Sequence, residues 1–549
     1  MSNLRSTKFL LPLIVAITLF VSFFRLGATT LFDVDEAVFA EATKEMIKTG
    51  DFITPTYNGV NRYDKPILFY WMMAASYKTF GINEFAARFP SALAGTLLVL
   101  SIFFFVRRFI GEKYAVYSTI SFVLSIYFFV YSHAAVTDML LTLFITVSIF
   151  SFYIFNADDF SDGSHISPYV RAMFSYGFYL FSALAFLTKG LIGIVFPFGI
   201  AIIYLAITKG PKEIKRVFNI KGIVLFLIVS GPWYGAQLAI NGMEFVDQFF
   251  IKHHFARYLD VISGHRGPFY YFIPVLLLGF FPWIVFFPSG IRAVIKDSNL
   301  TLLIRNIFND KKRKPVDHRA SIGLLAFIWF AVIFLFFSFS TTKLPNYILP
   351  SIPAVAILIS IGLSEHDKWE EYSYVVLGVF SFIVGMIIFF FSKKYLFKIG
   401  VYDDTTWTLG ISFLMFGMII VSLYRLFLKK TVFFYLCTLM TIFLIVFSIN
   451  ALPIINEYLQ GTLYRYSLYI KKNLPANEKI IVYDLNKPSI IFYSDHKILS
   501  IRNKEDMIRA LEKNAHAVVI AKAKNISNLT QLGLNVLKNE GDYAILERK

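Results

Sequence analysis

Charged residues are scarce in this chain. Asp, Glu, Lys and Arg make up only 16% of its 549 residues, whereas 57% are hydrophobic. A soluble protein of this length needs far more polar surface, so the composition indicates an integral membrane protein. Cysteine is nearly absent too, because Cys437 is the single one and lies in an apolar run. Disulfide scaffolds and cysteine metal sites are therefore excluded, and we interpret Cys437 as a small packed hydrophobe.

Nucleotide-binding signatures are also missing from the sequence. It contains no GxGxxG after a predicted strand and no GxxxxGK[ST], which argues against a nucleotide-linked substrate. The formal net charge of +17 is interpreted as a signal of membrane topology, because no soluble segment alternates basic and aromatic residues as a nucleic-acid surface would.

Long apolar runs are what the chain has instead. About 20 helical residues cross roughly 30 Å of hydrocarbon, and about thirteen runs meet or approach that length. No small-residue cleavage site follows the first run, so we expect it to be a retained helix. The runs lie at about 8–26, 85–106, 114–132, 138–156, 172–188, 190–207, 219–240, 270–291, 321–340, 346–363, 372–392, 407–427 and 431–451.

Basic residues in the loops orient this set of helices. The loops near 107–113, 209–216, 311–314 and 425–430 are rich in Lys and Arg, and such loops face the cytoplasm. The loops 27–84 and 241–269 and the tail 452–549 then lie on the opposite side, which in a bacterium is the periplasm. The unusual polar residues gather on that side, whereas a transporter needs a site near mid-membrane.

The loop 27–84 opens with three carboxylates. Asp33 and Glu36 have the spacing of a capping box at the start of a helix that Gly50 closes, so capping and function both stay open for them. Asp35 does not stand at a capping position, and we predict a functional role for it. Further along, Arg62, Tyr63, Asp64 and Lys65 precede Pro66, which keeps Lys65 out of a helix. Lys65 either snorkels toward lipid headgroups or binds a lipid phosphate.

Other polar residues stand at the ends of apolar runs on the same side. They are Asp138, which follows Thr137 and is either an N-cap or functional, Lys189 in a tight turn, His265 and Arg266 in HRGPFYY, and Lys343 and Tyr347 in TKLPNYILP. Several cations and at least two carboxylates therefore share one membrane face. A lipid carrier with a phosphate head fits this arrangement, because cations that bind the departing phosphate tightly accelerate the release of its sugar, and a carboxylate can orient groups or accept a proton.

The ordered motifs Asp35-Glu36, GDFITPTYNGVNRYDKP, Thr137-Asp138-Met139, LTKG, HRGPFYY and TKLPNYILP resemble the GT-C membrane glycosyltransferases. Within that class they are most similar to the bacterial 4-amino-4-deoxy-L-arabinose transferases that modify lipid A, relatives of the protein O-mannosyltransferases. The resemblance covers most of residues 30–350. It implies thirteen membrane helices, a periplasmic active site, an undecaprenyl phosphate-linked donor and an inverting displacement.

The resemblance also implies roles for individual residues. Asp35 and Asp138 would be the principal acidic site residues, and we add the neighbouring Glu36 as a third catalytic candidate. Lys65 and Lys189 would be the partners of the donor phosphate, and the cavity would be lined by His265, Arg266, Lys343 and Tyr347. We add Arg62 and Tyr63, which precede Lys65, to the residues predicted to bind the donor phosphate or lipid. The chain departs from the family at Val38-Phe39, where Arg-Tyr is usual, and at Asp64, where Glu is usual. A divalent metal would need Asp64 and His265 to meet, and two ligands fall short of the roughly four of a closed site, so we expect no required cofactor.

Beyond the last run the sequence changes character. IIVYD, IIFYS, KILSI and AVVIA have the pattern of short strands, with a helix from Asn503 to Lys513. We therefore predict an α-helical polytopic membrane domain over 1–452 and a small periplasmic α/β domain over 453–549, with a role in packing or acceptor contact.

We predict a glycosyltransferase of the bacterial inner membrane that moves a sugar, aminoarabinose or a similar one, from undecaprenyl phosphate to lipid A. The predicted partners are thus a polyprenyl-phosphate sugar, a lipid A-type glycolipid and membrane lipids. The cations outnumber what one leaving phosphate needs, which favours a phosphate acceptor. The alternatives are a protein or other glycan acceptor, for which Asp35 would serve as base, and a lipid or solute transporter, for which no internal repeat is found.

Overall fold

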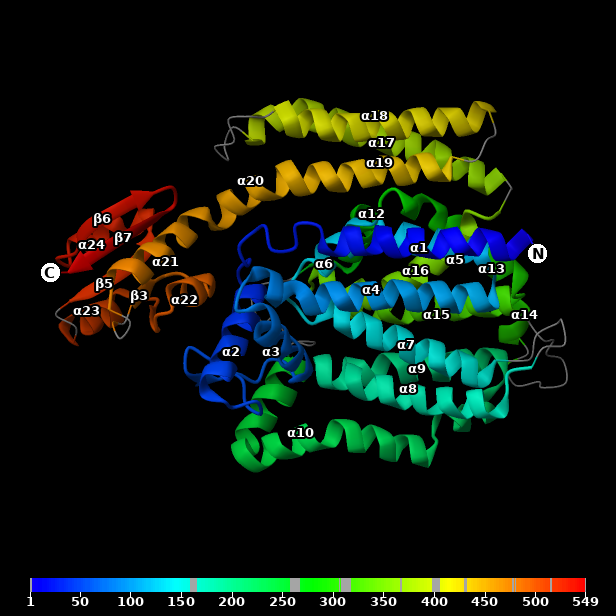
Figure 1. The fold of residues 1–549 in the computed structure, drawn as a ribbon, viewed down its shortest axis with the longest axis horizontal. Helices are drawn as coiled ribbons and strands as arrows, with labels where there is room; N and C mark the ends of the chain where they lie inside the picture. Colours follow the sequence, from blue (N-terminus) through cyan, green and yellow to red (C-terminus); the bar gives the residue numbers. More distant parts are fainter. Residues whose placement is uncertain are drawn as a thin grey trace. The chain divides into compact units, whose positions relative to one another are not determined.

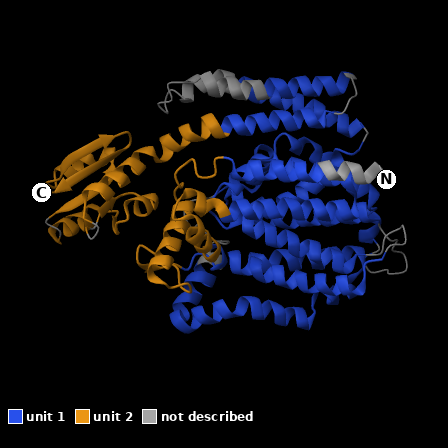
Figure 2. Cartoon of the chain, in the orientation of Figure 1, with its two compact units in different colours: residues 1–24, 63–69, 90–447 blue, residues 25–62, 70–89, 448–549 orange. Residues whose placement is uncertain are grey.

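The computed structural model describes residues 2–157, 165–256, 267–305, 307, 317–365, 368–396, 405–428, 432–475, 478, 480–513 and 516–548. Most of them are helical (Figure 1). The chain forms two compact units, each built from separate stretches of sequence (Figure 2). The first unit comprises Met1–Phe24, Tyr63–Phe69 and Pro90–Phe447, and the second comprises Arg25–Arg62, Tyr70–Phe89 and Ser448–Lys549.

The first unit is a bundle of apolar helices, in which α7, α8 and α9 pack on one another and α17 packs on α18 (Figure 1). Its α-helices are α1 (Ser2–Phe23), most of α4 (Glu84–Phe109), α5 (Glu112–Val123), α6 (Ile126–Ser132), α7 (Asp138–Asn156), α8 (Pro168–Lys189), α9 (Ile192–Thr208), α10 (Ile220–Val246), α12 (Phe272–Gly279), α13 (Phe287–Asp297), α14 (Leu300–Arg305), α15 (His318–Phe339), α16 (Ile352–Gly362), α17 (Lys368–Leu396), α18 (Thr405–Leu428) and α19 (Phe433–Val446). Shorter 3-10 or π segments are η1 (Pro211–Val217), η2 (Asp247–Ala256), η3 (Phe269–Tyr271), η4 (Trp283–Phe286) and η6 (Pro345–Ser351).

Several of these helices are long enough to cross a bilayer. In the described part of the chain, seven helices are long and apolar enough for a crossing, or up to nine if each of two bent pairs counts as one crossing. The protein is therefore a multi-pass helical membrane protein, as the composition predicts. The predicted number of about thirteen crossings is not confirmed by this criterion.

Two apolar runs that the sequence predicts as single helices are bent. The run 114–132 divides into α5 and α6, which meet at 61°, and the Ser125 hydroxyl caps α6 by accepting a hydrogen bond from the Phe128 N–H at 3.1 Å. The run 270–291 turns by 112° between Phe269–Gly279 and Trp283–Asp297. Pro282 lies at this break, and proline supplies no N–H and disfavours a helical residue before it. Hydropathy detects apolar length but not such breaks.

The second unit combines the segment after α1 with the C-terminal part of the chain. Its helices are α2 (Asp35–Thr49), most of α3 (Leu68–Phe80), α20 (Leu452–Asn456), α21 (Thr462–Asn473), α22 (Ser489–Ser494), α23 (Lys504–Lys513) and α24 (Ile526–Thr530), with the short segments η8 (Phe447–Ala451), η9 (Glu457–Gly461) and η10 (Ala523–Asn525). Its strands are β1 (Thr56–Tyr57), β2 (Val60–Asn61), β3 (Ile480–Tyr483), β4 (Ile498–Ile501), β5 (Ala517–Lys522), β6 (Asn535–Glu540) and β7 (Tyr543–Arg548).

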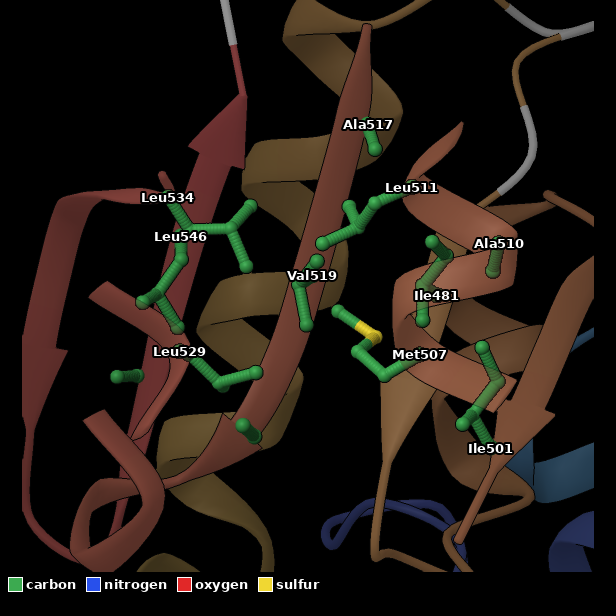
Figure 3. Close-up of a cluster of buried hydrophobic side chains, with 12 residues drawn as sticks. Ile481, Ile501, Met507, Ala510, Leu511, Ala517, Val519, Leu529, Leu534 and Leu546 are labelled. Atoms are coloured by element: carbon green, nitrogen blue, oxygen red, sulfur yellow. The ribbon is translucent and has the colours of Figure 1, made fainter. Parts of the chain in front are cut away.

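The five C-terminal strands form one mixed sheet in the order β4-β3-β5-β7-β6. Strand β3 pairs in parallel with β4 and β5, whereas β7 pairs antiparallel with β5 and β6. Alternate side chains of a strand face opposite sides of a sheet, so each face builds its own core. On one face, Ile481 and Val519 pack with Met507 of α23 (Figure 3). On the other, Ile480 and Ile520 pack with side chains of α21 and α22.

The structure corrects two details of the predicted tail. Strands β3, β4 and β5 and helix α23 are where the sequence places them, but residues 490–494 belong to α22 and not to a strand. All six residues of α22 are buried, and a short apolar run of this kind does not distinguish a strand from a buried helix. The prediction also missed β6 and β7. Every residue of β6 is exposed, so this strand has no apolar pattern to reveal it.

A cluster of ion pairs joins α2, α21 and α22. Asp495, at the end of α22, accepts from Lys44 at 2.6 Å, Lys48 at 3.0 Å and Lys471 at 2.7 Å. Lys44 is buried, and its ammonium also contacts the Glu41 carboxylate at 3.2 Å and the Phe492 carbonyl at 2.9 Å. These three lysines hold the pKa of Asp495 below its ordinary value, against the opposing effect of burial.

We expect Asp495→Asn to destabilise the protein by about 1–2 kcal/mol at neutral pH, because buried Lys44 loses a charged partner. A depressed carboxyl pKa gives stability that is present above the unfolded pKa of about 4 and is lost as pH falls through the folded pKa. The difference between wild type and variant should therefore shrink below about pH 4 in thermal unfolding experiments. Lys48→Gln is the control, since exposed pairs contribute about 0–1 kcal/mol. An Asp495→Asn protein as stable as wild type at neutral pH would contradict this expectation.

Candidate active site

Three residues from the predicted set meet at one end of the helices α7 and α8. Asp138 is the first residue of α7 and Lys189 is the last of α8. The Lys189 ammonium lies 2.5 Å from Asp138 Oδ1, with side-chain exposures of 12% and 3%, and 5.8 Å from the centre of the Tyr347 ring in η6. Thr137 is the N-cap residue of α7 but makes no side-chain capping bond. Asp138 is therefore bound to a cation, and this group can hold a phosphate or a sugar hydroxyl in charge-assisted hydrogen bonds.

Lys343 is also buried in the first unit, but its ammonium contacts backbone carbonyls. It donates to the carbonyls of Phe337 at 3.2 Å, Ser338 at 2.8 Å and Ser340 at 2.8 Å, and lies 5.5 Å from the centre of the Phe272 ring. Burial lowers the pKa of Lys343. Three carbonyls at the end of α15 are thereby satisfied, so in this conformation Lys343 closes a helix.

The segment 62–65 lies outside helices, as the proline after it predicts. Lys65 donates to the Asp64 carbonyl at 3.1 Å, and the buried Tyr63 ring packs edge-on against Phe245. In the other unit, the Arg62 guanidinium donates to the Tyr70 hydroxyl at 3.1 Å and lies 5.7 Å from the centre of the Phe39 ring.

Glu36 forms a buried ion pair with Arg88. Arg88 donates from Nε to Glu36 Oε1 and from Nη2 to Glu36 Oε2, both at 2.9 Å, and the two side chains are only 2% and 6% exposed. The same guanidinium donates to the carbonyls of Leu26, Thr29 and Thr30 at 2.8–3.1 Å. Glu36 Oε2 also accepts from the Phe32 N–H at 2.9 Å. This network fixes the fold of residues 26–36.

The capping-box alternative for Asp33 and Glu36, which the sequence left open beside a functional role, is wrong. The N-cap residue of α2 is Val34, which makes no side-chain capping bond. Asp33 instead accepts hydrogen bonds from Ser489, and Glu36 is occupied by Arg88. The other end of α2 is as predicted: Gly50 has φ 75° and its N–H donates to the Met46 carbonyl, the left-handed closing conformation that favours glycine.

Asp35 differs from its neighbours. Its side chain is exposed, whereas every residue of α2 from Glu36 to Lys44 is buried. Among the residues that the structure describes, no hydrogen bond or ion pair reaches the Asp35 carboxylate. An exposed carboxylate on a fixed segment can accept a hydrogen bond or a proton from a bound molecule.

His265 and Arg266 lie outside the described residues, and so does the contact of Asp64 with His265 that a metal site would require. Within the described ranges, no group of three or more His, Cys, Asp or Glu side chains is arranged to hold a metal ion.

The sequence analysis missed Arg88, Ser489 and Gln460. One signal for Arg88 was available, because an arginine at the start of an apolar helix is costly without a partner. Ser489 and Gln460 lie in the C-terminal part of the chain and contact Asp33. No local pattern links residues so far apart in sequence.

Comparison with known proteins first identifies a class of protein that this chain resembles. A family model described as dolichyl-phosphate-mannose-protein mannosyltransferase matches residues 64–235. This stretch contains Lys65, Asp138 and Lys189. The chain thus resembles membrane glycosyltransferases, as its motifs predict.

Individual relatives match a longer part of the chain. An uncharacterised protein of Aquifex aeolicus is 30% identical over 364 residues, covering 66% of this chain and 64% of the relative. The undecaprenyl phosphate-α-4-amino-4-deoxy-L-arabinose arabinosyl transferase of Aeromonas hydrophila is 31% identical over 356 residues, covering 64% of this chain and 59% of the relative. The match therefore spans about three fifths of each relative's length.

A solved structure shows the fold. The crystal structure of ArnT from Cupriavidus metallidurans bound to undecaprenyl phosphate matches with a TM-score of 0.80 at 20% identity, covering 98% of this chain and 97% of that one. This chain therefore has the fold of that protein, as its sequence motifs imply.

Proposed function

We propose that this protein is a glycosyltransferase that moves a sugar from undecaprenyl phosphate to lipid A at the periplasmic face of the bacterial inner membrane. The sugar we propose is 4-amino-4-deoxy-L-arabinose or one like it. The observation that carries the proposal is the group of Asp138, Lys189 and Tyr347. It joins a carboxylate, a cation and an aromatic ring from three elements at the ends of membrane helices, which suits a sugar linked to a lipid phosphate.

In the proposed reaction, an oxygen of the acceptor attacks the anomeric carbon of the sugar. The bond from that carbon to the donor phosphate breaks, the configuration inverts, and undecaprenyl phosphate leaves with the bonding electrons. Negative charge grows on the leaving phosphate, so Lys65 and Lys189 accelerate the step if they bind it more tightly in the transition state. Lys189 would exchange part of its contact with Asp138 for the phosphate.

The acidic residues have different proposed roles. A lipid A phosphate is already ionised at neutral pH, so its oxygen needs no strong base, and Asp35 then orients the acceptor or the sugar. Asp138 holds Lys189 in place, and its carboxylate is near enough to that ammonium to accept a hydrogen bond from a sugar hydroxyl bound beside it. Glu36 acts by fixing the segment that carries Asp35, because both of its oxygens accept from Arg88.

Three finer features belong to the same proposal. They are the thirteen crossings, the periplasmic orientation of the active site, and the division into a catalytic membrane domain over 1–452 and a C-terminal α/β domain over 453–549. The basic loops support the orientation. We also propose His265 and Arg266 as partners of the donor, and a divalent metal stays an optional addition that the reaction above does not use.

A second candidate is transfer to a protein hydroxyl. The description of the family model, a protein mannosyltransferase, favours it. Such an acceptor is a weak nucleophile, so Asp35 would have to remove its proton. The residues Val38 and Phe39, where the aminoarabinose transferases have Arg-Tyr, are buried and face the protein interior.

Mass spectrometry of lipid A from cells with and without the gene tests the choice of acceptor. We expect a sugar added to a lipid A phosphate, with the mass of an aminopentose if the substrate is that of the aminoarabinose transferases that the chain resembles. A sugar on periplasmic proteins and none on lipid A would select the second candidate.

A further inference from the structure

The segment that carries Asp35 is held on one side by residues from the far end of the chain. Asp33, two residues before Asp35, has a side chain that is only 3% exposed. Its Oδ1 accepts from the Ser489 N–H and its Oδ2 from the Ser489 hydroxyl, both at 2.8 Å. The Gln460 amide, in the orientation that satisfies both groups, donates to Asp33 Oδ2 and accepts from the Asp33 N–H, each at 3.0 Å. Lys487 adds a positive charge 3.7 Å from Oδ2.

Two more contacts of the same kind come just before Asp33. The Leu31 N–H donates to the Tyr493 hydroxyl at 2.8 Å. The Thr30 N–H and hydroxyl both donate to Asn456 Oδ1, at 3.1 and 2.7 Å. Residues 30, 31 and 33 are therefore each bound by the stretch 456–493, while Glu36 and Arg88 fix the segment from within the N-terminal part.

A structural anchor alone does not require a buried carboxylate. Burial raises the pKa of Asp33, and the hydrogen bonds from Ser489 and the charge of Lys487 act against that rise. Burying a carboxylate costs free energy that apolar packing would avoid. The carboxylate accepts hydrogen bonds from several donors at once, and it therefore fixes the orientation of the backbone next to Asp35.

We propose that Asp33, with Ser489 and Gln460, is a positioning group through which the C-terminal part of the chain sets the place of Asp35 for transfer. Asp33 does not touch the reacting atoms. The C-terminal part then has a role in the chemical step beyond packing or acceptor contact. This inference rests on the proposed function, because Asp35 matters only if transfer occurs.

Kinetics of the purified full-length protein test this role. We expect Ser489→Ala to lower kcat by about tenfold, the order expected when a hydrogen bond to a charged group is lost, with the donor KM changed by less than about twofold. Ser489→Thr keeps the hydroxyl and should recover most of kcat. Asp33→Asn should lower kcat further, and the double variant with Ser489→Ala should be no worse than Asp33→Asn alone, because both act through one contact.

Met507→Ala is the matched control, since Met507 lies in the core on one face of the sheet (Figure 3), whereas α22, which carries Ser489, packs in the core on the other face. It should lower the unfolding temperature without lowering kcat. Hydrogen exchange of residues 31–38 gives a readout that needs no activity, and Ser489→Ala should raise it while Met507→Ala does not.

An unchanged kcat in Ser489→Ala, or an equal loss in Met507→Ala, would overturn the positioning role. A wild-type protein that transfers nothing from any polyprenyl-phosphate sugar would instead overturn the proposed function. For a protein without transfer activity, hydrogen exchange would test only whether Ser489 anchors the segment of Asp33. Exchange of residues 31–38 that Ser489→Ala leaves unchanged would reject this anchoring.

Discussion

Asp35→Asn is expected to lower kcat for sugar transfer by about 10²-fold or more, because a reactant that loses its orienting contact is misplaced for the reaction. The folded protein should be unaffected, because the Asp35 side chain is exposed and surface substitutions usually change stability by less than about 0.5 kcal/mol. Transfer from a labelled polyprenyl-phosphate sugar measures the first quantity, and thermal unfolding in detergent measures the second.

Lys65→Ala tests the proposed contact with the sugar donor. We expect it to abolish transfer while leaving a folded protein that detergent extracts normally, because Lys65 lies outside the helices and its proposed task is to bind the donor phosphate. Turnover close to that of wild type in both variants would refute the assignment of these residues to the site.

Glu36→Gln is expected to destabilise the protein strongly, whereas Asp35→Asn is expected to leave its stability unchanged, although the two residues are neighbours. It leaves the Arg88 guanidinium buried without its counter-charge, and breaking a buried pair in this way costs about 3–5 kcal/mol. The expected results are a large drop in unfolding temperature and poor yield of extractable protein.

The partner variant gives the control for this expectation. Arg88→Met also removes the donors to the carbonyls of Leu26, Thr29 and Thr30, so we expect at least as large a loss. The double variant should be less destabilised than the sum of the single ones, because one interaction is removed only once. A stable but inactive Glu36→Gln protein would show instead that Glu36 contacts the substrate, as the family resemblance implies.

Sequence reasoning succeeded where the deciding forces are local. The run 138–156 is the helix α7, because apolar residues in the right number make a membrane helix. Gly50 ends α2 as predicted, since its left-handed conformation is a property of that residue. The parallel strands β3 and β5 were visible as short runs of β-branched residues.

It failed where the partner is distant. Asp33 and Glu36 have the spacing of a capping box, and only the fold shows that Arg88 and Ser489 take both carboxylates. Arg88 is 52 residues from Glu36, and Ser489 is 456 residues from Asp33. Ion pairs and hydrogen bonds over such separations depend on tertiary packing, for which a single sequence has no local pattern. The bend at Pro282 was missed for another reason, because average hydropathy does not register a break within an apolar run.

Transfer by the purified protein from labelled undecaprenyl phosphate-aminoarabinose to lipid A in detergent tests the proposed function most directly. We expect label on a lipid A phosphate with wild type and at least about 10²-fold slower labelling with Asp35→Asn, and undecaprenyl phosphate should be released in an amount equal to the label transferred. Label on a peptide hydroxyl instead would keep a glycosyltransferase and change its acceptor. No transfer from any polyprenyl-phosphate sugar, with uptake of lipid or solute by vesicles that contain the protein, would contradict the proposed function and favour a transporter.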